Sequence, residues 1–264
     1  MAEFEIKRRQ LFEFTDLIWW PKSLRSMITT FLHANIEKYK PYSQELDLIT
    51  QAIQSNKNNQ IIDLCSGNLG PWLHLKKQLE EKHHDKINII FTDKYPNLTF
   101  THQINEIDNF TYYPQSVDAR DVPKTLTGTR TIFNGFHHFN PNDAQKIIDN
   151  SIESKQPIII FELLNRNWKD ILIVTIFTPF YIFLTMPFFM KLSFNNIFFT
   201  YIFPLFPITF TWDTVVSHLR CYSEKELENM IQKADKDKNY IWDIGKYRHG
   251  NFPVLYCIAY PKNN

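Results

Sequence analysis

Residues 61–72 constrain the fold of this chain more than any other segment. They read IIDLCSGNLGPW, so an apolar run ends in Asp63, small residues follow, and Pro71 begins a helix pattern. Proline suits the first turn of a helix, where its missing N–H would have no partner in any case. Glycine is scarce, with six in 264 residues, so the pair Gly67 and Gly70 stands out. The segment predicts a buried strand that turns tightly into a helix around a nucleotide-like ligand.

Strand and helix patterns alternate after residue 60. We predict strands at 60–64, 87–92, 111–117, 129–134 and 157–164, with helices at 71–83 and 141–154. Such alternation is typical of a parallel sheet that helices cover on both faces. Ser223 and Glu226 then have the spacing of a capping box, and strand patterns follow at 240–247 and 253–260. We therefore predict an α/β fold, in which a Rossmann-like seven-stranded sheet ends in an antiparallel hairpin and carries helices on both faces.

The charge balance and the cysteines exclude several classes of protein. The net charge is +1 with no basic arm, so we expect no nucleic-acid partner. The three cysteines, Cys65, Cys221 and Cys257, form no CxxC pair, which argues against a disulfide framework. The adjacent pair His137 and His138 lacks the i,i+4 spacing of a helical zinc site, and we expect no metal. No apolar core of a secretory signal follows Met1, so a cytoplasmic chain is the simplest interpretation.

Two regions extend this α/β pattern. We predict an N-terminal helical cap over 1–58, with helices at 22–38 and 43–55, and a main domain over 59–264 that contains a hydrophobic insert at 169–212. Within the insert, residues 171–190 and 192–212 carry no charge, and Lys191 alone separates them. A helix needs about 20 apolar residues to cross a bilayer.

We therefore predict that residues 171–212 form a helical hairpin that contacts membrane lipid. A buried helical pair under a lid is the alternative, but it would show polar residues on its outer face. Two full spans and a shallow hairpin both fit the length. The insert contains four prolines, which favour a bent hairpin: Pro179, Pro187, Pro204 and Pro207.

Polar residues follow the other predicted strands at the same edge of the sheet. Asp93 ends the second strand, Asp118 and Ala119 follow the third, and Asn134 follows the fourth. Ligands bind at the carboxyl ends of strands in open α/β sheets. Taken singly, each of these acids could be an ordinary turn residue or helix cap. His137 and His138 come just after Asn134, and histidine can take a proton near neutral pH. They are candidate catalytic bases, with packed structural residues as the alternative.

The segment from Asp63 to Gly70 resembles motif I of the class I S-adenosylmethionine-dependent methyltransferases, although Cys65 and Leu69 stand where glycines are usual. The resemblance covers roughly residues 58–164 and 213–262, and it includes the terminal pair of strands. It implies that Asp93 holds the ribose of S-adenosylmethionine (SAM) and that Asp118 and Ala119 lie at the adenine. The remaining cofactor-binding residues that it implies are Asp63, Ser66, Gly67, Asn68, Gly70 and Asn134.

The resemblance implies a SAM-dependent methyltransferase. The insert lies where this fold receives its substrate, so we expect a lipophilic or membrane-associated small-molecule acceptor and a cytoplasmic, membrane-associated enzyme. A membrane-tethered cofactor-binding or scaffold protein without catalysis is one alternative. A nicotinamide-dependent oxidoreductase is the other, but the loop after the first strand is CSGNLG rather than GxGxxG.

Overall fold

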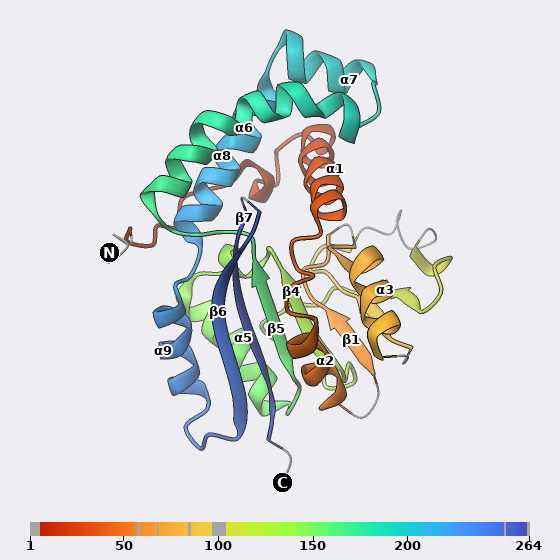
Figure 1. The fold of residues 1–264 in the computed structure, drawn as a ribbon, viewed down its shortest axis with the longest axis vertical. Coiled ribbons are helices and arrows are strands. Elements are labelled where there is room, and N and C mark those ends of the chain that lie inside the picture. Colours follow the sequence, from red (N-terminus) through yellow and green to blue (C-terminus); the bar gives the residue numbers. More distant parts are fainter. Residues whose placement is uncertain are drawn as a thin grey trace. The chain divides into compact units, whose positions relative to one another are not determined.

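The chain forms two compact units in the computed structural model, which describes residues 6–56, 59–67, 69–83, 86–96, 104–250 and 252–262 (Figure 1). One unit consists of Lys40–Leu163 with Ser223–Asn264, and the other of Met1–Tyr39 with Leu164–Tyr222. We call them the sheet unit and the helical unit and describe each by itself.

The sheet unit is built on seven strands in the order β3-β2-β1-β4-β5-β7-β6. The strands are β1 (Gln60–Asp63), β2 (Asn88–Phe91), β3 (Phe110–Tyr112), β4 (Thr129–Phe133), β5 (Ile158–Glu162), β6 (Tyr240–His249) and β7 (Phe252–Pro261). Strands β1 to β5 are parallel, and β7 is antiparallel to both β5 and β6. This confirms the predicted α/β fold and its antiparallel terminal hairpin.

Helices α2 (Leu46–Gln54), α3 (Trp72–His83), α5 (Pro141–Glu153) and α9 (Glu224–Ala234) surround this sheet. α2 packs on β5 and β7, and α5 and α9 pack against each other; in Figure 1 α5 lies behind the strands and α9 beside β6. β5 is buried along its whole length, which explains its continuous apolar run, whereas β4 also buries the polar residues Thr129, Arg130 and Thr131. α9 begins with the expected capping box, because the Ser223 and Glu226 side chains each bond the other's backbone N–H.

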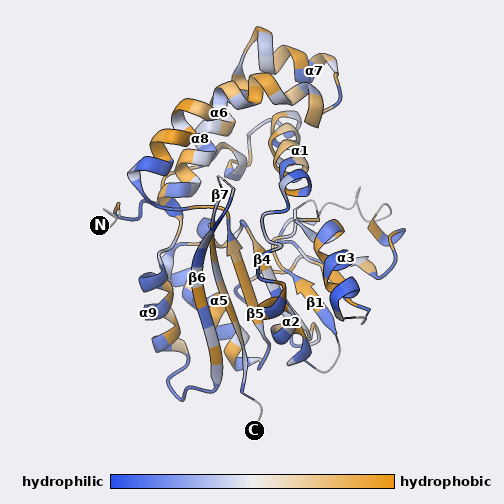
Figure 2. Cartoon of the chain, in the orientation of Figure 1, coloured by the Kyte–Doolittle hydropathy of each residue, from blue (hydrophilic) through white to orange (hydrophobic). Residues whose placement is uncertain are grey.

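The helical unit contains the hydrophobic insert. Its helices are α1 (Lys22–Tyr39), α6 (Trp168–Phe189), α7 (Phe194–Ile197), the π-helical turn η3 (Phe198–Ile202) and α8 (Leu205–Arg220). α1 packs against α6 and α8, and α6 packs along α8. Figure 2 shows hydrophobic residues along most of α6 and α7. The insert is thus a helical hairpin whose two arms, α6 and α8, are joined by the short elements α7 and η3.

Polar residues of α8 hold the N-terminal segment within the same unit. The Asp213 carboxylate accepts hydrogen bonds from the backbone N–H groups of Phe14 (2.7 Å) and Thr15 (3.1 Å). Arg220, two turns further along, donates to the Leu11 carbonyl at 2.7 Å and to the Asp16 carboxylate at 2.7 Å. Both charged side chains therefore hold the 3-10 turn η1 (Phe14–Asp16) in place, and this role is structural.

Contacts group residues 40–58 with the sheet and residues 6–39 with the insert, whereas the sequence predicted one cap over 1–58. The reason lies in the two amphipathic helices of this region. α2 buries Ile49, Ala52 and Ile53 and packs on β5 and β7. α1 buries its apolar side against α6 and α8.

Candidate functional site

The loop after β1 has a glycine-like backbone at residues that are not glycine. Cys65 (φ +57°) and Leu69 (φ +61°) lie in the left-handed region, as do Gly67 (φ +49°) and Gly70 (φ +52°). A left-handed conformation costs a residue with a side chain about 1–2 kcal/mol. Strained residues of this kind cluster at functional sites. Cys65 and Leu69 therefore differ from the usual glycines in their side chains, but their backbone has the conformation that glycine would adopt.

Asp63 closes β1 and is buried at the base of this loop. Its carboxylate accepts a hydrogen bond of 2.6 Å from the Thr131 hydroxyl on the neighbouring strand β4. Burial raises the pKa of Asp63 to about 6. The loop is tied to the end of β2, because Ser66 N–H donates to the Thr92 carbonyl (3.1 Å) and Thr92 N–H donates to the Asp63 carbonyl (2.8 Å).

Asp93 contacts the same loop from the end of β2. Gly67 N–H donates to one Asp93 carboxylate oxygen at 3.2 Å, and Tyr95 N–H donates to the other at 2.8 Å. A Cβ atom placed on Gly67 would meet nothing within 4 Å, so open space lies in front of the loop. The structure thus brings two predicted cofactor residues together beside space that a ligand can occupy.

Asp118 is held in a cluster of charges. Arg120 donates to both of its carboxylate oxygens, at 2.9 Å and 2.6 Å, and Lys94 lies 3.1 Å away. The Arg120 guanidinium holds the pKa of Asp118 well below its usual range. Val117 N–H donates to the Asp93 carbonyl at 3.0 Å, which places Asp118 near that strand end. Ala119 is buried beside it, and their role at the adenine stays a prediction. Asn68 lies outside the described residues.

Asn134 links the ends of β4 and β5. Its backbone N–H donates to the Phe161 carbonyl at 2.8 Å, and its side-chain oxygen accepts from Leu163 N–H at 2.7 Å. The φ angle of Asn134 is +50°, a conformation that asparagine tolerates better than most residues. This turn directs the chain into the short 3-10 helix η2 (Phe136–His138), which carries both candidate histidines.

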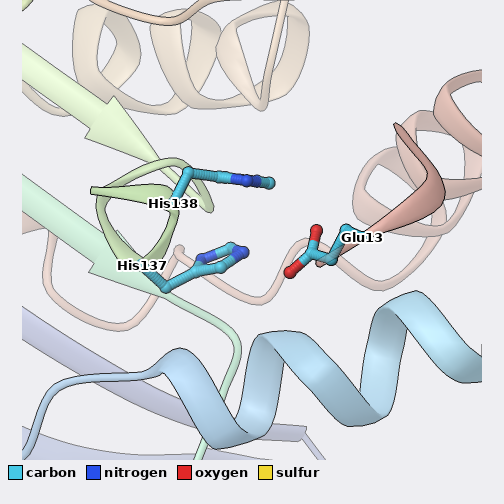
Figure 3. A group of neighbouring side chains, drawn as sticks. All are labelled: Glu13, His137 and His138. Atoms are coloured by element: carbon cyan, nitrogen blue, oxygen red, sulfur yellow. The ribbon is translucent and has the colours of Figure 1, made fainter. Parts of the chain in front are cut away.

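His137 is fixed by a buried carboxylate at the end of β5. Its ring nitrogen Nδ1 lies 2.6 Å from Glu162 Oε2, and its backbone N–H donates to Glu162 Oε1 at 3.0 Å. The His138 ring lies beside that of His137, with ring centres 4.2 Å apart (Figure 3). Glu13, also drawn in Figure 3, belongs to the helical unit, where it pairs with Arg220 at 3.2 Å.

Sequence reasoning missed Glu162 and Tyr42. Glu162 ends β5 just as Asp63 ends β1, and that shared pattern of an acid after an apolar run was the available signal. Tyr42 has no such signal, because its neighbours are distant in the sequence. Its buried ring lies 5.0 Å from that of Phe133 and 5.4 Å from that of Phe161. Burial, with the nearby Glu162 charge, raises the pKa of Tyr42 well above its usual value.

Comparisons with known proteins find similarity in structure alone. No protein family model matches the chain. No curated protein matches its sequence. Among solved structures, the CMeT domain of the citrinin polyketide synthase aligns with 94% of this chain and 59% of its own, at 9% identity and a TM-score of 0.54. The chain has the class I methyltransferase fold. The decisive feature is β7, which lies between β5 and β6 and runs antiparallel to both.

Two further structures align over most of this chain. A SAM-dependent methyltransferase from Aquifex aeolicus shares 12% identity over 88% of this chain and 97% of its own, with a TM-score of 0.48. A provisionally named Zn-dependent alcohol dehydrogenase from Rhodobacter sphaeroides shares 10% identity over 90% of this chain and 98% of its own, with a TM-score of 0.50. At sequence identities this low, the similarity shows the fold alone. The activity has to be argued from the residues of the site.

Proposed function

We propose that this protein is a SAM-dependent methyltransferase that acts on a lipophilic or membrane-associated small molecule. The observation that carries the proposal is the loop after β1, which has left-handed residues at 65, 67, 69 and 70 and which Gly67 N–H joins to Asp93 at the carboxyl edge of a class I sheet. Asp63 would hold the cofactor ammonium, Asp93 would hold the ribose hydroxyls, and the open space at Gly67 fits a ligand that must approach the backbone closely.

SAM supplies a methyl group that is already activated by its sulfonium, so the protein has to align the acceptor, exclude water and remove a proton. We assign the proton transfer to His137. Glu162 accepts a hydrogen bond from Nδ1–H, which leaves the lone pair on Nε2 for the acceptor. A carboxylate that orients a histidine in this way also stabilises the charged ring after the proton is taken.

The helical unit supports membrane contact. Within the described residues, α6 is the one helix long and apolar enough to cross a membrane, with a mean hydropathy of 2.0 and only 11% of its most apolar window buried. A soluble protein rarely leaves so much contiguous apolar surface in water. Because the chain enters this unit directly after β5, the proposed enzyme would be anchored beside a supply of lipophilic acceptors.

The alternatives have less support. A nicotinamide-dependent oxidoreductase commonly has a sixth strand parallel to the others, whereas β7 and β6 form an antiparallel pair here. A scaffold without catalysis has no need of a buried carboxylate on a histidine.

Transfer of a labelled methyl group from SAM into organic-extractable material of a membrane extract tests the proposal. Label that stays entirely on the cofactor in all extracts would count against it.

Replacing Asp93 by alanine is expected to weaken SAM binding at least tenfold. The carboxylate would accept hydrogen bonds from the two ribose hydroxyls, each worth about 1.5–3 kcal/mol. Equilibrium dialysis with labelled SAM measures the change. Asp237→Ala is the matched control, because Asp237 is exposed in the turn after α9, and its removal should leave the affinity unchanged. Equal affinities of the wild-type and Asp93→Ala proteins would remove Asp93 from the site.

SAM affinity is expected to fall at low pH. The pKa of Asp63 is raised to about 6, so below that pH its carboxyl is protonated in the cofactor-free protein. An ammonium group binds the carboxylate and not the acid, so the affinity should fall with decreasing pH through about 6 and approach a tenfold loss per pH unit. Dissociation constants measured between about pH 5 and 7.5 test this. Asp63→Asn should flatten the profile, and an equally steep profile in that variant would assign the proton elsewhere.

A further inference from the structure

Exposed apolar side chains are concentrated on the helical unit. Among the described residues, every large apolar side chain that is substantially exposed lies on this unit, except Leu73, Tyr95 and Ile241. On α6 five of them recur at every fourth position, and we call this set the open stripe: Leu172, Ile176, Phe180, Leu184 and Phe188. Each step of four residues turns by about 40° around a helix, so the five positions spread over about 160° of one broad side. α6 therefore presents a continuous apolar surface that no described residue covers.

The opposite side of α6 is packed against protein. Ile182 and Met186 are fully buried in a cluster that contains Met27 and Phe31 of α1 and Phe206 of α8. The Phe31 ring lies 6.0 Å from that of Tyr181 and 5.7 Å from that of Phe189. The second half of α6 is thus fixed to α1, and the two helices cannot enter a different environment separately.

α1 is a polar helix apart from its buried side. It carries Lys22, Glu37 and Lys38, and Asn35 bonds the Tyr181 hydroxyl of α6. Charged side chains in the hydrocarbon core of a bilayer are costly unless they face a water-filled or protein interior. If α6 crossed the bilayer, the packing on Ile182 and Met186 would carry α1 into the hydrocarbon with it.

The chain also connects the sheet unit to residues at both ends of α6. Four residues, 164–167, link the sheet unit to the start of α6. At the other end, the Tyr39 ring lies 6.5 Å from that of Phe189, and the next residue, Lys40, belongs to the sheet unit. α6 has 22 residues and is about 33 Å long at 1.5 Å per residue. A helix that crossed the bilayer would separate these two attachments by its whole thickness.

We propose that α6 lies in the plane of one membrane leaflet, with the open stripe in the hydrocarbon and α1 on the water side. This orientation rests on the membrane contact in the proposed function. Lys169 and Lys191, just inside the start and just past the end of α6, are both exposed and can reach the headgroups of the same leaflet. The occupant of the open stripe is lipid, because residues 171–190 and 192–212 offer no charge to a protein partner.

The turn before α1 provides a second insertion point. Ile18 is 94% exposed and Trp19 is 72% exposed, whereas the adjacent Trp20 is buried in the cluster with α6 and α8. The Arg25 side chain fixes this turn by donating to the Thr15 carbonyl at 3.1 Å and to the Leu17 carbonyl. The two exposed side chains are therefore presented on a fixed turn, and tryptophan is favoured at membrane interfaces.

Spin-label depth measurements on the full chain test the orientation. Nitroxides are attached to Leu172→Cys, Ile176→Cys, Phe180→Cys, Leu184→Cys and Phe188→Cys in a Cys65→Ala background, in which Cys221 and Cys257 are buried. The protein is bound to vesicles of phosphatidylcholine and phosphatidylglycerol. The five positions turn through about 160° around the helix axis, so in the plane of one leaflet the label at residue 180 should be deepest, and those at residues 172 and 188 should be shallower and at equal depth in the same leaflet. Labels at residues 172 and 188 that lie in opposite leaflets, with the label at residue 180 at the bilayer centre, would overturn the in-plane orientation.

Substitutions in the turn test the second insertion point. Ile18→Asp with Trp19→Asp should weaken vesicle binding at least tenfold. Leu73→Asp, on the sheet unit, is the control and should leave binding unchanged. Unchanged binding of the Ile18/Trp19 variant would overturn the insertion of this turn. If the wild-type protein does not bind vesicles at all, the membrane contact in the proposed function fails, whereas SAM binding would still stand.

Discussion

Replacing His137 by alanine is expected to lower the rate of methyl transfer by about 10²–10⁴-fold, the usual contribution of a general base. The affinity for SAM should change little, because Asp63 and Asp93, which are proposed to hold the ammonium and the ribose of the cofactor, lie at the ends of β1 and β2 and not on η2. The reason for choosing His137 is its 2.6 Å contact with the buried carboxylate of Glu162, which fixes the ring and the position of its proton. Initial rates at saturating SAM, with binding measured in parallel, separate the two effects.

Glu162 provides the matched test of this assignment. Glu162→Gln keeps the size of the side chain but removes its charge, and we expect a loss of about 10–100-fold in rate, as for other residues that orient a functional histidine. Glu162→Asp should recover part of that loss. The carboxylate of Glu162 contacts His137, so His138→Ala should have the smaller effect. Wild-type rates in the His137→Ala and His138→Ala proteins would make both histidines structural.

Placing charges on the open stripe is expected to release the protein from membranes. In Phe180→Glu with Leu184→Glu, two side chains that each contribute about 1.5–3 kcal/mol on burial are lost, and two charges must be kept out of lipid. The vesicle partition coefficient should therefore fall by at least about a hundredfold. Co-sedimentation with vesicles at low and high salt measures this, and high salt should leave the wild-type protein bound.

Point substitutions are preferable to removal of residues 171–212. That deletion would take away Ile182, Met186 and Phe206, against which α1 buries Phe31. The helical unit would then lose its core along with its membrane surface. SAM binding by the Phe180/Leu184 variant should match that of the wild-type protein, because these side chains are exposed and are not part of the cofactor loops. A variant that remains fully bound to vesicles would show that lipid does not cover the stripe.

The sequence predicted the sheet well because β1, β2 and β5 are short apolar runs that end at or just before an acid: Asp63, Asp93 and Glu162. The third strand is shorter than expected: it ends at Tyr112 and not near residue 117. Pro114 explains the difference, since proline has no N–H to donate to a neighbouring strand. The class of fold followed from the alternation of these runs with helices and from the terminal pair of strands.

The boundaries of the insert were harder to predict. The absence of charge suggested that the second arm ends near Trp212, but α8 runs on to Arg220. Asp213 and Arg220 are polar because they hold the N-terminal segment, and this contact spans about 200 residues of sequence. The lack of charge therefore marked where the apolar stretch ends and not where the helix ends.

The candidate site was predicted only in part, because some of its features have a local signal in the sequence and others depend on contacts between distant residues. Strand-end acids such as Asp63 and Asp93 have a local signal, and the structure joins their loops through Gly67. The pairing of His137 in η2 with Glu162 at the end of β5 joins residues 25 positions apart, so it needs the register of β4 against β5. The left-handed backbone at Cys65 and Leu69 also has no signal in the residue types themselves.

Calorimetric titration of SAM into the protein tests whether the loops after β1 and β2 bind this cofactor, on which the proposed function depends. We expect saturable binding of one SAM per chain and competition by S-adenosylhomocysteine. We also expect no measurable binding of NAD at the same concentrations. Failure to bind SAM, in a protein whose folding is verified by its secondary structure and by a cooperative thermal transition, would contradict the account.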